Sequence, residues 1–192
     1  TEATVFLPIC IWKATKIIDY IMDSEKVYEV TLKLGIRTTT YDLEGEVLEE
    51  RDPSHLTEEE ILNAINSFKG EYSQIPPMYS ALKQNGVRLY ELARKGIEVE
   101  RKGRLVNIYN LEDIKINNPY ISMKVTCSKG TYIRSLCYDI GEKLGVFATM
   151  TQLNRAKTSV FSQEKSININ ELTKENINDY ILSMEAALEK YD

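Results

Sequence analysis

Strict alternation of apolar and polar residues predicts a strand in the N-terminal third of the chain. Residues 27–35, VYEVTLKLG, place the side chains of Tyr28, Val30, Leu32 and Leu34 on a common face. A strand with this pattern buries one face and exposes the other to water. We therefore expect Tyr28 to point with the buried face of its strand.

Apolar residues at helical spacing predict several helices. One of them has a clear start, because Thr57 and Glu60 match the capping box that begins many helices. We expect Gly70, Gly96 and Gly145 to end helices, since glycine readily adopts the left-handed backbone of a C-terminal cap. The helical segments are 12–22, 57–70, 87–96, 131–145 and a tail helix after residue 171 that contains Ile177, Ile181, Met184 and Leu188.

The remaining segments predict further strands and one stiff loop. Residues 35–50 are expected to form a loop and then a strand, and residues 104–117 and 120–128 two strands joined by a turn. Two prolines stiffen the loop 74–86, QIPPMYSALKQNG, because each fixes φ and removes an amide donor. Strands interspersed with helices, without repeated βαβ units, predict an α+β fold with a mixed or antiparallel sheet flanked by helices.

Length and composition are those of an ordinary globular domain. The chain has 192 residues, of which 43% are apolar and 28% charged, so we expect one domain over residues 1–192. The longest apolar run, residues 5–12, is too short to span a bilayer. It also lacks the basic flank and cleavage site of a signal peptide. We therefore expect a cytoplasmic protein without a membrane partner.

The cysteines and the single histidine argue against several kinds of site. Cys10, Cys127 and Cys137 are widely spaced and form no CxxC pair, which disfavours both a disulfide framework and a zinc site. His55 is the only histidine, and we interpret it as a loop residue before a helix start. We expect no metal site and no catalytic triad built on histidine.

Charge is unevenly distributed along a chain whose formal net charge is −5. An acidic chain disfavours nonspecific binding to polyanions but still permits a local basic surface. On charge alone, the segment 83–104 fits two interpretations equally well: a contact for a phosphate-bearing partner, or a solvated face. Its basic residues are Lys83, Arg88, Arg94, Lys95, Arg101, Lys102 and Arg104.

A permanent cation, Arg134, stands inside an apolar run. Residues 128–145, SKGTYIRSLCYDIGEKLG, place it where a strand is expected to give way to a helix. A guanidinium buried among apolar side chains needs an anionic partner, because an unpaired buried charge is very costly. Its fork of N–H donors suits a carboxylate. On these residues alone, a structural salt bridge is favoured over a role in catalysis.

Three segments, in this order, resemble the TruB family of tRNA pseudouridine synthases. The first is KVYEVTLKLG with TYDLEGEV, the second QIPPMYSALKQNGVRLYELARKG, and the third GTYIRSLCYDIGEKLG followed by LNRAKTSVF. The resemblance runs over nearly the whole chain. It implies the fold of a pseudouridine synthase catalytic domain and an isomerase that converts the T-loop uridine of tRNA to pseudouridine without cofactor or metal. It also implies that the target nucleotide is extruded from the RNA into a pocket.

The same resemblance implies roles for individual residues. Arg134 matches the arginine that holds the catalytic carboxylate, and Tyr28 matches the tyrosine that stacks on the target uracil. Tyr132 and Leu153 match further positions of the base pocket, and Asp42 matches a loop aspartate of the family, so that these residues are expected to bind the substrate. Without the family, Tyr28 would be a core tyrosine and Asp42 a turn residue.

The resemblance also implies an RNA partner for the basic segment 83–104. We expect Lys83, Arg88, Arg94 and Lys95 to contact the RNA backbone, with the T arm of tRNA as the partner. Recognition of RNA by shape and by a splayed-out loop agrees with this expectation. The protein itself is expected to be a monomer.

The catalytic loop of the family, GTLDPxATGxLPxxxGxATK, is only partly matched. The chain begins TEATVFLPICIWKATK, and alignment of the shared residues sets Thr1 on the family proline. The catalytic aspartate then falls one position before Thr1. Glu2 is offset by two residues and has a longer side chain, so it is not nominated as a replacement. The expectation is a catalytic domain truncated at its N-terminus and lacking the C-terminal RNA-binding module of the family.

Other positions also depart from the family pattern. Val5, Trp12 and Ser159 stand where the family has glycines, and Thr39 stands where it has an aspartate. A side chain at a glycine position can clash or exclude the native backbone angles. The sequence leaves three hypotheses: a tRNA pseudouridine synthase, a noncatalytic RNA-binding relative, and an α+β interaction domain in which every feature is structural.

Overall fold

The computed structural model describes residues 2–188 of the chain, with side chains described from residue 6 onward. Within that range, seven strands form one main sheet in the order β1–β10–β2–β9–β8–β5, with β11 paired to β10. The strands are β1 (Glu2–Val5), β2 (Lys26–Leu34), β5 (Gly70–Gln74), β8 (Arg104–Asn117), β9 (Tyr120–Cys127), β10 (Ala148–Thr158) and β11 (Phe161–Ser162).

The sheet is mixed, as the sequence predicts. β1 runs parallel to β10, whereas the other neighbouring strands of the sheet are antiparallel. Two hairpins form separate two-stranded sheets, one of β3 (Ile36–Thr38) with β4 (Val47–Glu50), the other of β6 (Lys83–Gln84) with β7 (Val87–Arg88). The predicted α+β class is confirmed.

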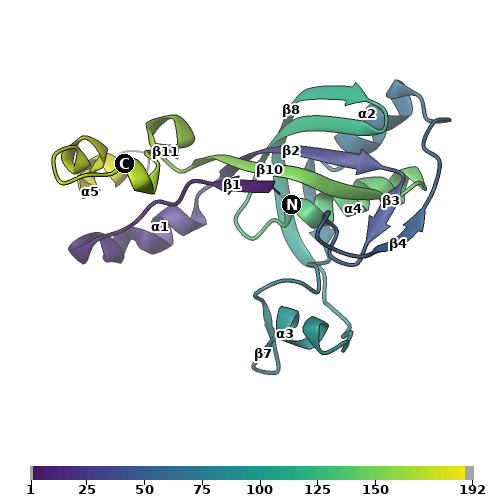
Figure 1. Ribbon diagram of the computed structural model, residues 1–192, viewed down its shortest axis with the longest axis horizontal. Coiled ribbons are helices and arrows are strands. Elements are labelled where there is room, and N and C mark those ends of the chain that lie inside the picture. The colour runs from purple at the N-terminus through teal and green to yellow at the C-terminus, as the bar shows by residue number, and fades with distance from the viewer. Residues whose placement is uncertain (1, 189–192) are drawn as a thin grey trace.

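Helices pack against the sheet and against each other. α4 contacts β10, β2 and α2, so that α2 and α4 form a helical layer beside the strands (Figure 1). The α-helices are α1 (Ile18–Asp23), α2 (Glu58–Asn66), α3 (Leu89–Arg94), α4 (Ile133–Leu144) and α5 (Met184–Leu188). The 3₁₀ helices are η1 (Trp12–Ile17), η2 (Gln163–Lys165), η3 (Ile169–Glu171) and η4 (Ile177–Tyr180).

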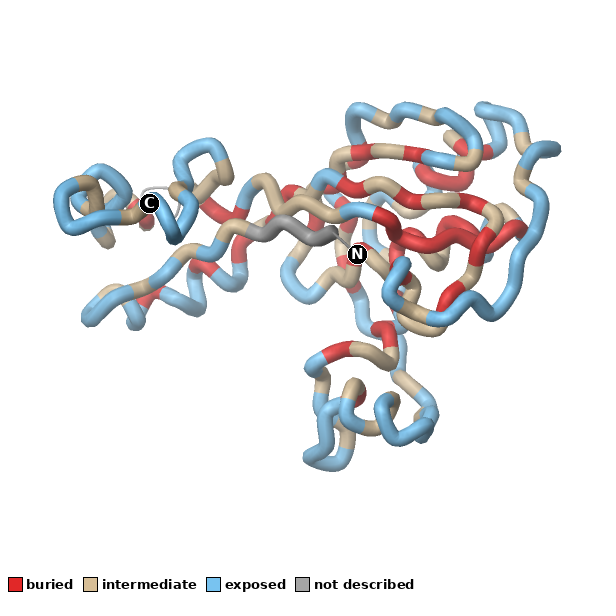
Figure 2. The backbone as a smooth tube through the Cα atoms, in the orientation of Figure 1, coloured by how far each residue is buried: buried red, intermediate tan, exposed pale blue. Residues whose placement is uncertain are grey.

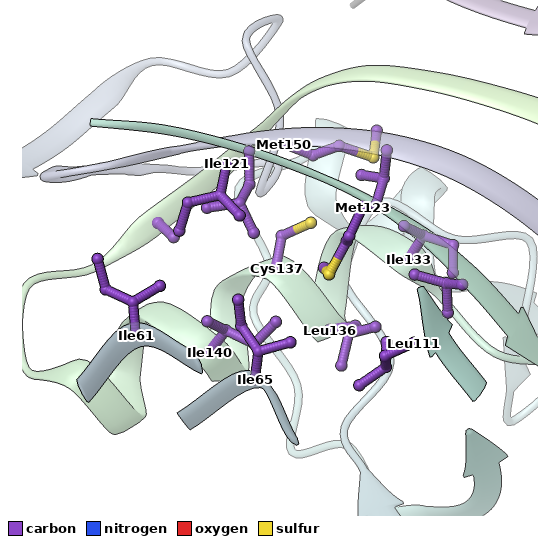
Figure 3. Packing of buried hydrophobic residues seen from close by; sticks show 14 of the residues in the cluster. Ile61, Ile65, Leu111, Ile121, Met123, Ile133, Leu136, Cys137, Ile140 and Met150 are labelled. Atoms are coloured by element: carbon purple, nitrogen blue, oxygen red, sulfur yellow. The ribbon is translucent and has the colours of Figure 1, made fainter. Parts of the chain in front are cut away.

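The main core lies between these helices and the sheet. Figure 3 shows Ile61 and Ile65 of α2 and Leu136 of α4 converging with Met123 and Met150 from the strands. Burial alternates along β2 as its sequence predicts, with Val30, Leu32 and Leu34 buried and Tyr28 partly buried against the same core. The apolar face of α4 thereby fixes the direction in which its first turn points.

The capping box predicted at the start of α2 is present. The Thr57 side chain accepts a hydrogen bond from the Glu60 amide, and the Glu60 carboxylate accepts one from the Thr57 amide. The expected stop at Gly70 is wrong, because α2 already ends at Asn66. Gly70 has φ +101° and instead opens β5, a strand that the sequence pattern does not predict.

The predicted tail helix is broken in two. η4 ends at Tyr180, Ile181 is extended, and α5 starts anew at Met184. The Ser183 hydroxyl accepts a hydrogen bond from the Ala186 amide, as an N-terminal cap does. Polar side chains that bond the backbone locally compete with a continuous helix, which explains the interruption.

Two parts of the chain extend from the main body (Figure 1). A small lobe, residues 81–103, carries β6, β7 and α3 at the bottom of the view. An arm at the left joins η1 and α1 to the C-terminal segment, where Ile17 and Ile21 pack with Ala187 in a second, smaller core. Exposed residues predominate in both extensions (Figure 2). No helix among the described residues is long and apolar enough to cross a membrane.

The Asp139 carboxyl of α4 is partly buried beside Tyr72 of β5. Burial and the nearby Glu142 carboxylate raise the pKa of Asp139, a hydrogen bond from the Tyr72 hydroxyl partly offsets both effects, and the resulting pKa is about 7. The folded protein therefore favours the protonated form of this carboxyl at a pH where an unfolded chain ionises it.

The pKa of Asp139 predicts stability that falls as pH rises. The folded pKa lies above the unfolded value, so the contribution is complete below about pH 4 and is lost as pH passes through about 7. In Asp139→Asn this decline should be smaller by about 2 kcal/mol, after allowing for partial exposure. Urea unfolding from pH 4.5 to 8 measures the effect. Asp179→Asn, at an exposed carboxylate, should keep the wild-type slope; an unchanged slope in Asp139→Asn would contradict the prediction.

Candidate functional site

Arg134 and Asp42 form an ion pair at the start of α4. The Arg134 Nη1 donates to Asp42 Oδ2 at 2.9 Å, with side-chain exposures of 24% and 7%. The pair joins residues that are 92 positions apart in the sequence. The anionic partner that a half-buried Arg134 requires is thus Asp42 within the described chain, and its predicted hold on a further, catalytic carboxylate stays a prediction.

The turn after β3 is built to hold the Asp42 carboxylate. Its Oδ1 accepts hydrogen bonds from the Thr40 hydroxyl at 2.6 Å and from the Glu44 amide at 3.1 Å. The Asp42 carbonyl accepts from the Thr38 hydroxyl at 2.7 Å. Short hydroxyl and amide contacts of this kind fix a carboxylate in one orientation. The predicted part of Asp42 in substrate binding is not tested by these contacts.

An aromatic stack joins the same two elements as the ion pair. Tyr41, directly before Asp42, stacks on Tyr138 of α4 with ring centroids 4.1 Å apart. Tyr41 has φ +64°, a left-handed backbone that is uncommon for a bulky residue. Tyr138 follows Arg134 by one helical turn, so both contacts leave the same face of α4. The turn is therefore attached to α4 at two neighbouring points.

Arg134 also binds the loop that leads to the basic lobe. Its Nη2 donates to the Tyr79 carbonyl at 2.8 Å, and Nη1 also approaches the Thr40 carbonyl at 3.3 Å. A guanidinium has five N–H donors. The contacts with Asp42, Thr40 and Tyr79 use three of them. Arg134 thus retains donors with which a further acceptor could be bound.

Tyr28 and Leu153 lie on neighbouring strands, β2 and β10. Tyr28 faces Arg155, and Leu153 faces Val30, in the register of this strand pair. Both side chains are partly buried against the main core. Burial raises the pKa of the Tyr28 phenol above its ordinary value, while Arg155 opposes the rise by its charge and a hydrogen bond. Tyr28 is therefore neutral at ordinary pH.

Tyr132 occupies the residue before the first turn of α4. Its φ and ψ of −92° and 107° are extended, and its own side chain makes no capping hydrogen bond. The side chain of Gln74 contacts its backbone instead, with the Tyr132 amide donating to Gln74 Oε1 at 2.8 Å. The structure thus brings Tyr132, Arg134 and Asp42 to one end of α4, and Tyr28 and Leu153 together on the sheet.

The four residues expected to contact RNA lie on the projecting lobe. Lys83, Arg88, Arg94 and Lys95 are all exposed. Tyr90 organises two of them, because the guanidinium groups of Arg88 and Arg94 lie 5.8 and 5.3 Å from its ring centroid. Such stacking restricts an arginine without neutralising it. Residues 81–103 contain six basic residues against Glu91, Glu98 and Glu100, so the lobe presents a net positive charge at some distance from the sheet.

Two of the residues aligned with family glycines have left-handed backbones. Trp12 and Ser159 both have φ +54°. Trp12 is 87% exposed, so its side chain has open space and the constraint lies in the backbone alone. The Thr39 amide donates to the Glu46 carbonyl at 3.0 Å, and its hydroxyl accepts from the Glu46 amide at 3.1 Å. Thr39 therefore closes the Asp42 turn. The Val5 side chain and Glu2 side chain lie outside the described side chains.

The sequence pattern does not mark three residues of this region. Gln74 and Tyr79 lie in the loop segment QIPPMYSALKQNG, and Arg155 lies in LNRAKTSVF, but none follows an apolar period that would mark it. Their partners are distant in sequence; Arg155, for instance, donates to the carbonyl of Phe6 at 2.8 Å. Only a tertiary structure could show these contacts. Among the described residues, no group of three or more His, Cys, Asp and Glu side chains could hold a metal ion.

Comparison with known proteins identifies the class of this fold and site. The model of the TruB family pseudouridylate synthase N-terminal domain matches residues 1–133, and that of the tRNA pseudouridylate synthase B C-terminal domain matches residues 134–189. These matches define the chain as one of the pseudouridylate synthase class. The chain belongs to the TruB family.

Close relatives support the same family. The chain is 63% identical over 192 residues to tRNA pseudouridine synthase B of Clostridium perfringens, covering 100% of this chain and 65% of the relative. It is 61% identical over 190 residues to tRNA pseudouridine synthase B of Clostridium tetani, covering 99% of this chain and 66% of the relative. The chain therefore spans slightly less than two thirds of the length of these relatives.

A solved structure shows the same fold at lower identity. The chain superposes on a chain of a Cbf5–Nop10–Gar1 complex with a TM-score of 0.71 and 26% identity. The similarity covers 97% of this chain and 50% of that one. The predicted pseudouridine synthase fold is confirmed by these matches.

The left-handed backbone at Trp12 predicts a gain from glycine. A Cβ in this conformation costs about 1–2 kcal/mol, whereas glycine adopts it freely. Trp12→Gly should therefore be more stable than Trp12→Ala by about 1 kcal/mol, since Trp12 has φ +54° and little buried surface to lose. Urea unfolding of the two variants measures the difference.

Leu105 provides the control for this comparison. It is also exposed, but it lies in the extended backbone of β8. The same pair of substitutions should there have the opposite order, with Leu105→Gly less stable than Leu105→Ala. If glycine were the less stable choice at both positions, the strain assigned to Trp12 would be absent.

Proposed function

We propose that this chain is the catalytic body of a tRNA pseudouridine synthase that isomerises the T-loop uridine. In this reaction the bond between uracil N1 and ribose C1′ breaks, the base turns, and a bond forms between C5 and C1′. The proton on C5 leaves to solvent and N1 gains one, so the atoms balance without a cofactor or metal. Substrate binding requires the uridine to leave the RNA stack for a pocket.

The observation that carries this proposal is the ion pair of Arg134 with Asp42. A permanently charged guanidinium, fixed at the start of α4 and retaining N–H donors, is suited to hold and keep ionised a second carboxylate. The family motif aligns that carboxylate, the catalytic aspartate, one position before Thr1, outside the printed sequence. The backbone of β1 supports this arrangement, because Ala3 pairs with Leu153 on the strand next to Tyr28.

The pocket residues are proposed by their places around this centre. Tyr28 would stack on the uracil, Leu153 would form an apolar wall beside it, and Tyr132 would contact the substrate from the start of α4. The position of Tyr28 and Leu153 on adjacent strands supports this assignment. Asp42 would act on the substrate through the arginine that it orients. Arg134 and Tyr28 are the two catalytic residues that this chain itself supplies.

We further propose that the projecting lobe holds the T arm of a tRNA through its phosphates. Lys83, Arg88, Arg94 and Lys95 are exposed there, and the loop 74–80 connects them directly to Arg134. A basic surface that binds backbone gives affinity with little sequence preference. We also propose that the protein is a cytoplasmic, monomeric enzyme, as expected from its sequence.

A tritium-release assay tests the catalytic proposal. A T-arm stem-loop RNA carrying 5-tritiated uridine loses its label when C5 is joined to C1′. The chain of residues 1–192, without any extension, should bind this RNA without releasing tritium. A version extended by Gly-Thr-Leu-Asp before Thr1 should release it, because the family aspartate is then in place. Arg134→Lys in the extended version should reduce release at least about a hundredfold, since lysine cannot reproduce the fork geometry.

An extension ending in Asn instead of Asp is the matched control and should bind RNA without release. If the Asp-extended chain bound RNA but released nothing, the noncatalytic RNA-binding alternative would replace the proposal. Release by the chain without any extension would mean that another nucleophile is present, and Glu2→Gln would then be the first variant to measure. Absence of RNA binding in every version would contradict both functions.

The salt dependence of RNA binding tests the lobe. Each phosphate contact contributes about 0.7–0.9 to the slope of log affinity against log salt. Lys83→Gln combined with Lys95→Gln should therefore lower the slope by about 1.5 and weaken binding at moderate salt. Fluorescence anisotropy with the stem-loop RNA between 50 and about 200 mM salt, the range over which such effects are large, measures both quantities.

Two exposed lysines in the C-terminal segment serve as the charge-matched control. Lys165→Gln combined with Lys174→Gln removes the same charge from the arm, away from the lobe. The slope of this control should equal that of the wild type. Equal slopes for the two double variants would show that the lobe contributes only general charge.

A further inference from the structure

Gln74 is a buried polar residue at the end of β5 whose side chain is fully bonded. It is 1% exposed. Its Oε1 accepts a hydrogen bond from the Tyr132 amide at 2.8 Å, and its Nε2 donates to the Tyr132 carbonyl at 3.1 Å. The two ends of one amide thus grip the backbone of one residue, much as a neighbouring strand would. Burying such a group is tolerated only because it is satisfied.

The orientation of this amide is itself fixed. The Tyr132 carbonyl requires the nitrogen on its side, and Nε2 also donates to the Tyr72 hydroxyl there. The Tyr132 amide requires the oxygen on the other side. An amide flip would break both contacts with the Tyr132 backbone, so these two contacts determine which atom is which. Gln74 is therefore a rigid support, not an adaptable one.

The residue that Gln74 grips begins the helix that carries the site. Tyr132 precedes the first turn of α4 and has no capping side chain of its own. Helix starts leave backbone donors without intrahelical partners, and their direction depends on what binds them. Arg134 lies two residues further on, so a shift of the Tyr132 backbone would move the guanidinium as well.

Two more hydrogen bonds join the same loop to the same turn of helix. The Ser135 hydroxyl donates to the Ile75 carbonyl at 2.9 Å, and Arg134 Nη2 donates to the Tyr79 carbonyl at 2.8 Å. Residues 74–79 are thereby fastened along the start of α4. Of these three side chains, Gln74 is the one that binds both the amide and the carbonyl of a single residue, Tyr132.

We propose that Gln74 is a positioning residue for the uridine pocket: it holds the Tyr132 backbone so that Tyr132 and Arg134 face the base. The inference rests on the proposed function. Gln74 touches neither substrate nor reacting atoms, since it is buried behind Tyr132. A small displacement of residues that bind a reacting group has a large effect on binding and rate.

The alternative is that Gln74 serves only to provide hydrogen bonds to buried polar groups and so contributes to stability alone. In that case its replacement would lower stability but would leave recognition of the base unchanged. The two possibilities are separated by the part of RNA affinity that depends on the base, because general phosphate contacts do not contribute to it. Stability alone could not separate them.

The experiment compares two stem-loop RNAs that differ only at the target position, one with uridine and one with an abasic site. The dissociation constant for the abasic RNA divided by that for the uridine RNA measures what the base contributes to binding. Gln74→Met keeps the size of the side chain and removes its polar atoms, and should lower this ratio at least about tenfold. Its affinity for the abasic RNA should stay within about twofold of wild type, because the phosphate contacts are intact.

Two further variants make the result specific. Ile65→Val removes a methyl group from the core, where Ile65 is 0% exposed, and should lower stability while keeping the wild-type ratio. Gln74→Leu also removes both polar atoms, so its ratio should fall together with that of Gln74→Met. It also provides a second folded variant if Gln74→Met is too unstable.

The outcomes distinguish the two proposals. A wild-type ratio retained in both Gln74 variants would overturn the positioning role and leave the proposed function standing. A wild-type protein that binds both RNAs equally, or neither, would overturn the proposed uridine pocket and the role of Gln74 with it. A ratio lost in Gln74→Met and retained in Ile65→Val is the result that the proposal expects.

Discussion

A partly buried guanidinium needs an anionic partner and further acceptors, and this requirement of Arg134 organises the centre of this protein. Removing one partner of such a pair leaves an uncompensated charge, which costs far more than the pair itself contributes. Arg134 takes its acceptors from the turn at Asp42 and from the loop at Tyr79. Three segments that are distant in sequence are therefore held together by one side chain.

The turn that supplies Asp42 is stable only as a whole. Its carboxylate is oriented by Thr40, its carbonyl by Thr38, and the adjacent Tyr41 adopts a left-handed backbone. Such a backbone costs free energy and persists where its surroundings over-determine it. The stack of Tyr41 on Tyr138 and the ion pair beneath it provide that constraint. The same contacts that hold the strained turn therefore also hold Asp42 and Arg134 in place.

The sequence predicted those features that depend on neighbours along the chain. The alternation around Tyr28, the capping box at Thr57 and the glycine cap at Gly145 are local patterns, and the structure confirms each. It also predicted that Arg134 needs an anion, because that follows from burial and charge. It could not name Asp42 as the anion, since only tertiary packing brings the two together. β5, GEYSQ, has Tyr72 as its only apolar residue, so no alternation predicts it. The tail helix is broken because local polar contacts compete with the apolar period there.

The glycine positions of the family show what kind of constraint a sequence comparison can carry. Trp12 and Ser159 keep the backbone angle that glycine would adopt, so the family pattern at these positions records a required φ more than a required absence of side chain. The exposure of Trp12 supports this interpretation, because a steric requirement would have displaced an indole of that size. The strained residue begins η1, and the following residues Ile17 and Ile21 anchor the arm through the small second core. Packing in the arm thus stabilises the left-handed backbone at Trp12, which a residue with a side chain disfavours. The arm is also connected to the sheet, because Arg155 donates to the carbonyl of Phe6 and lies on β10, the strand next to Tyr28.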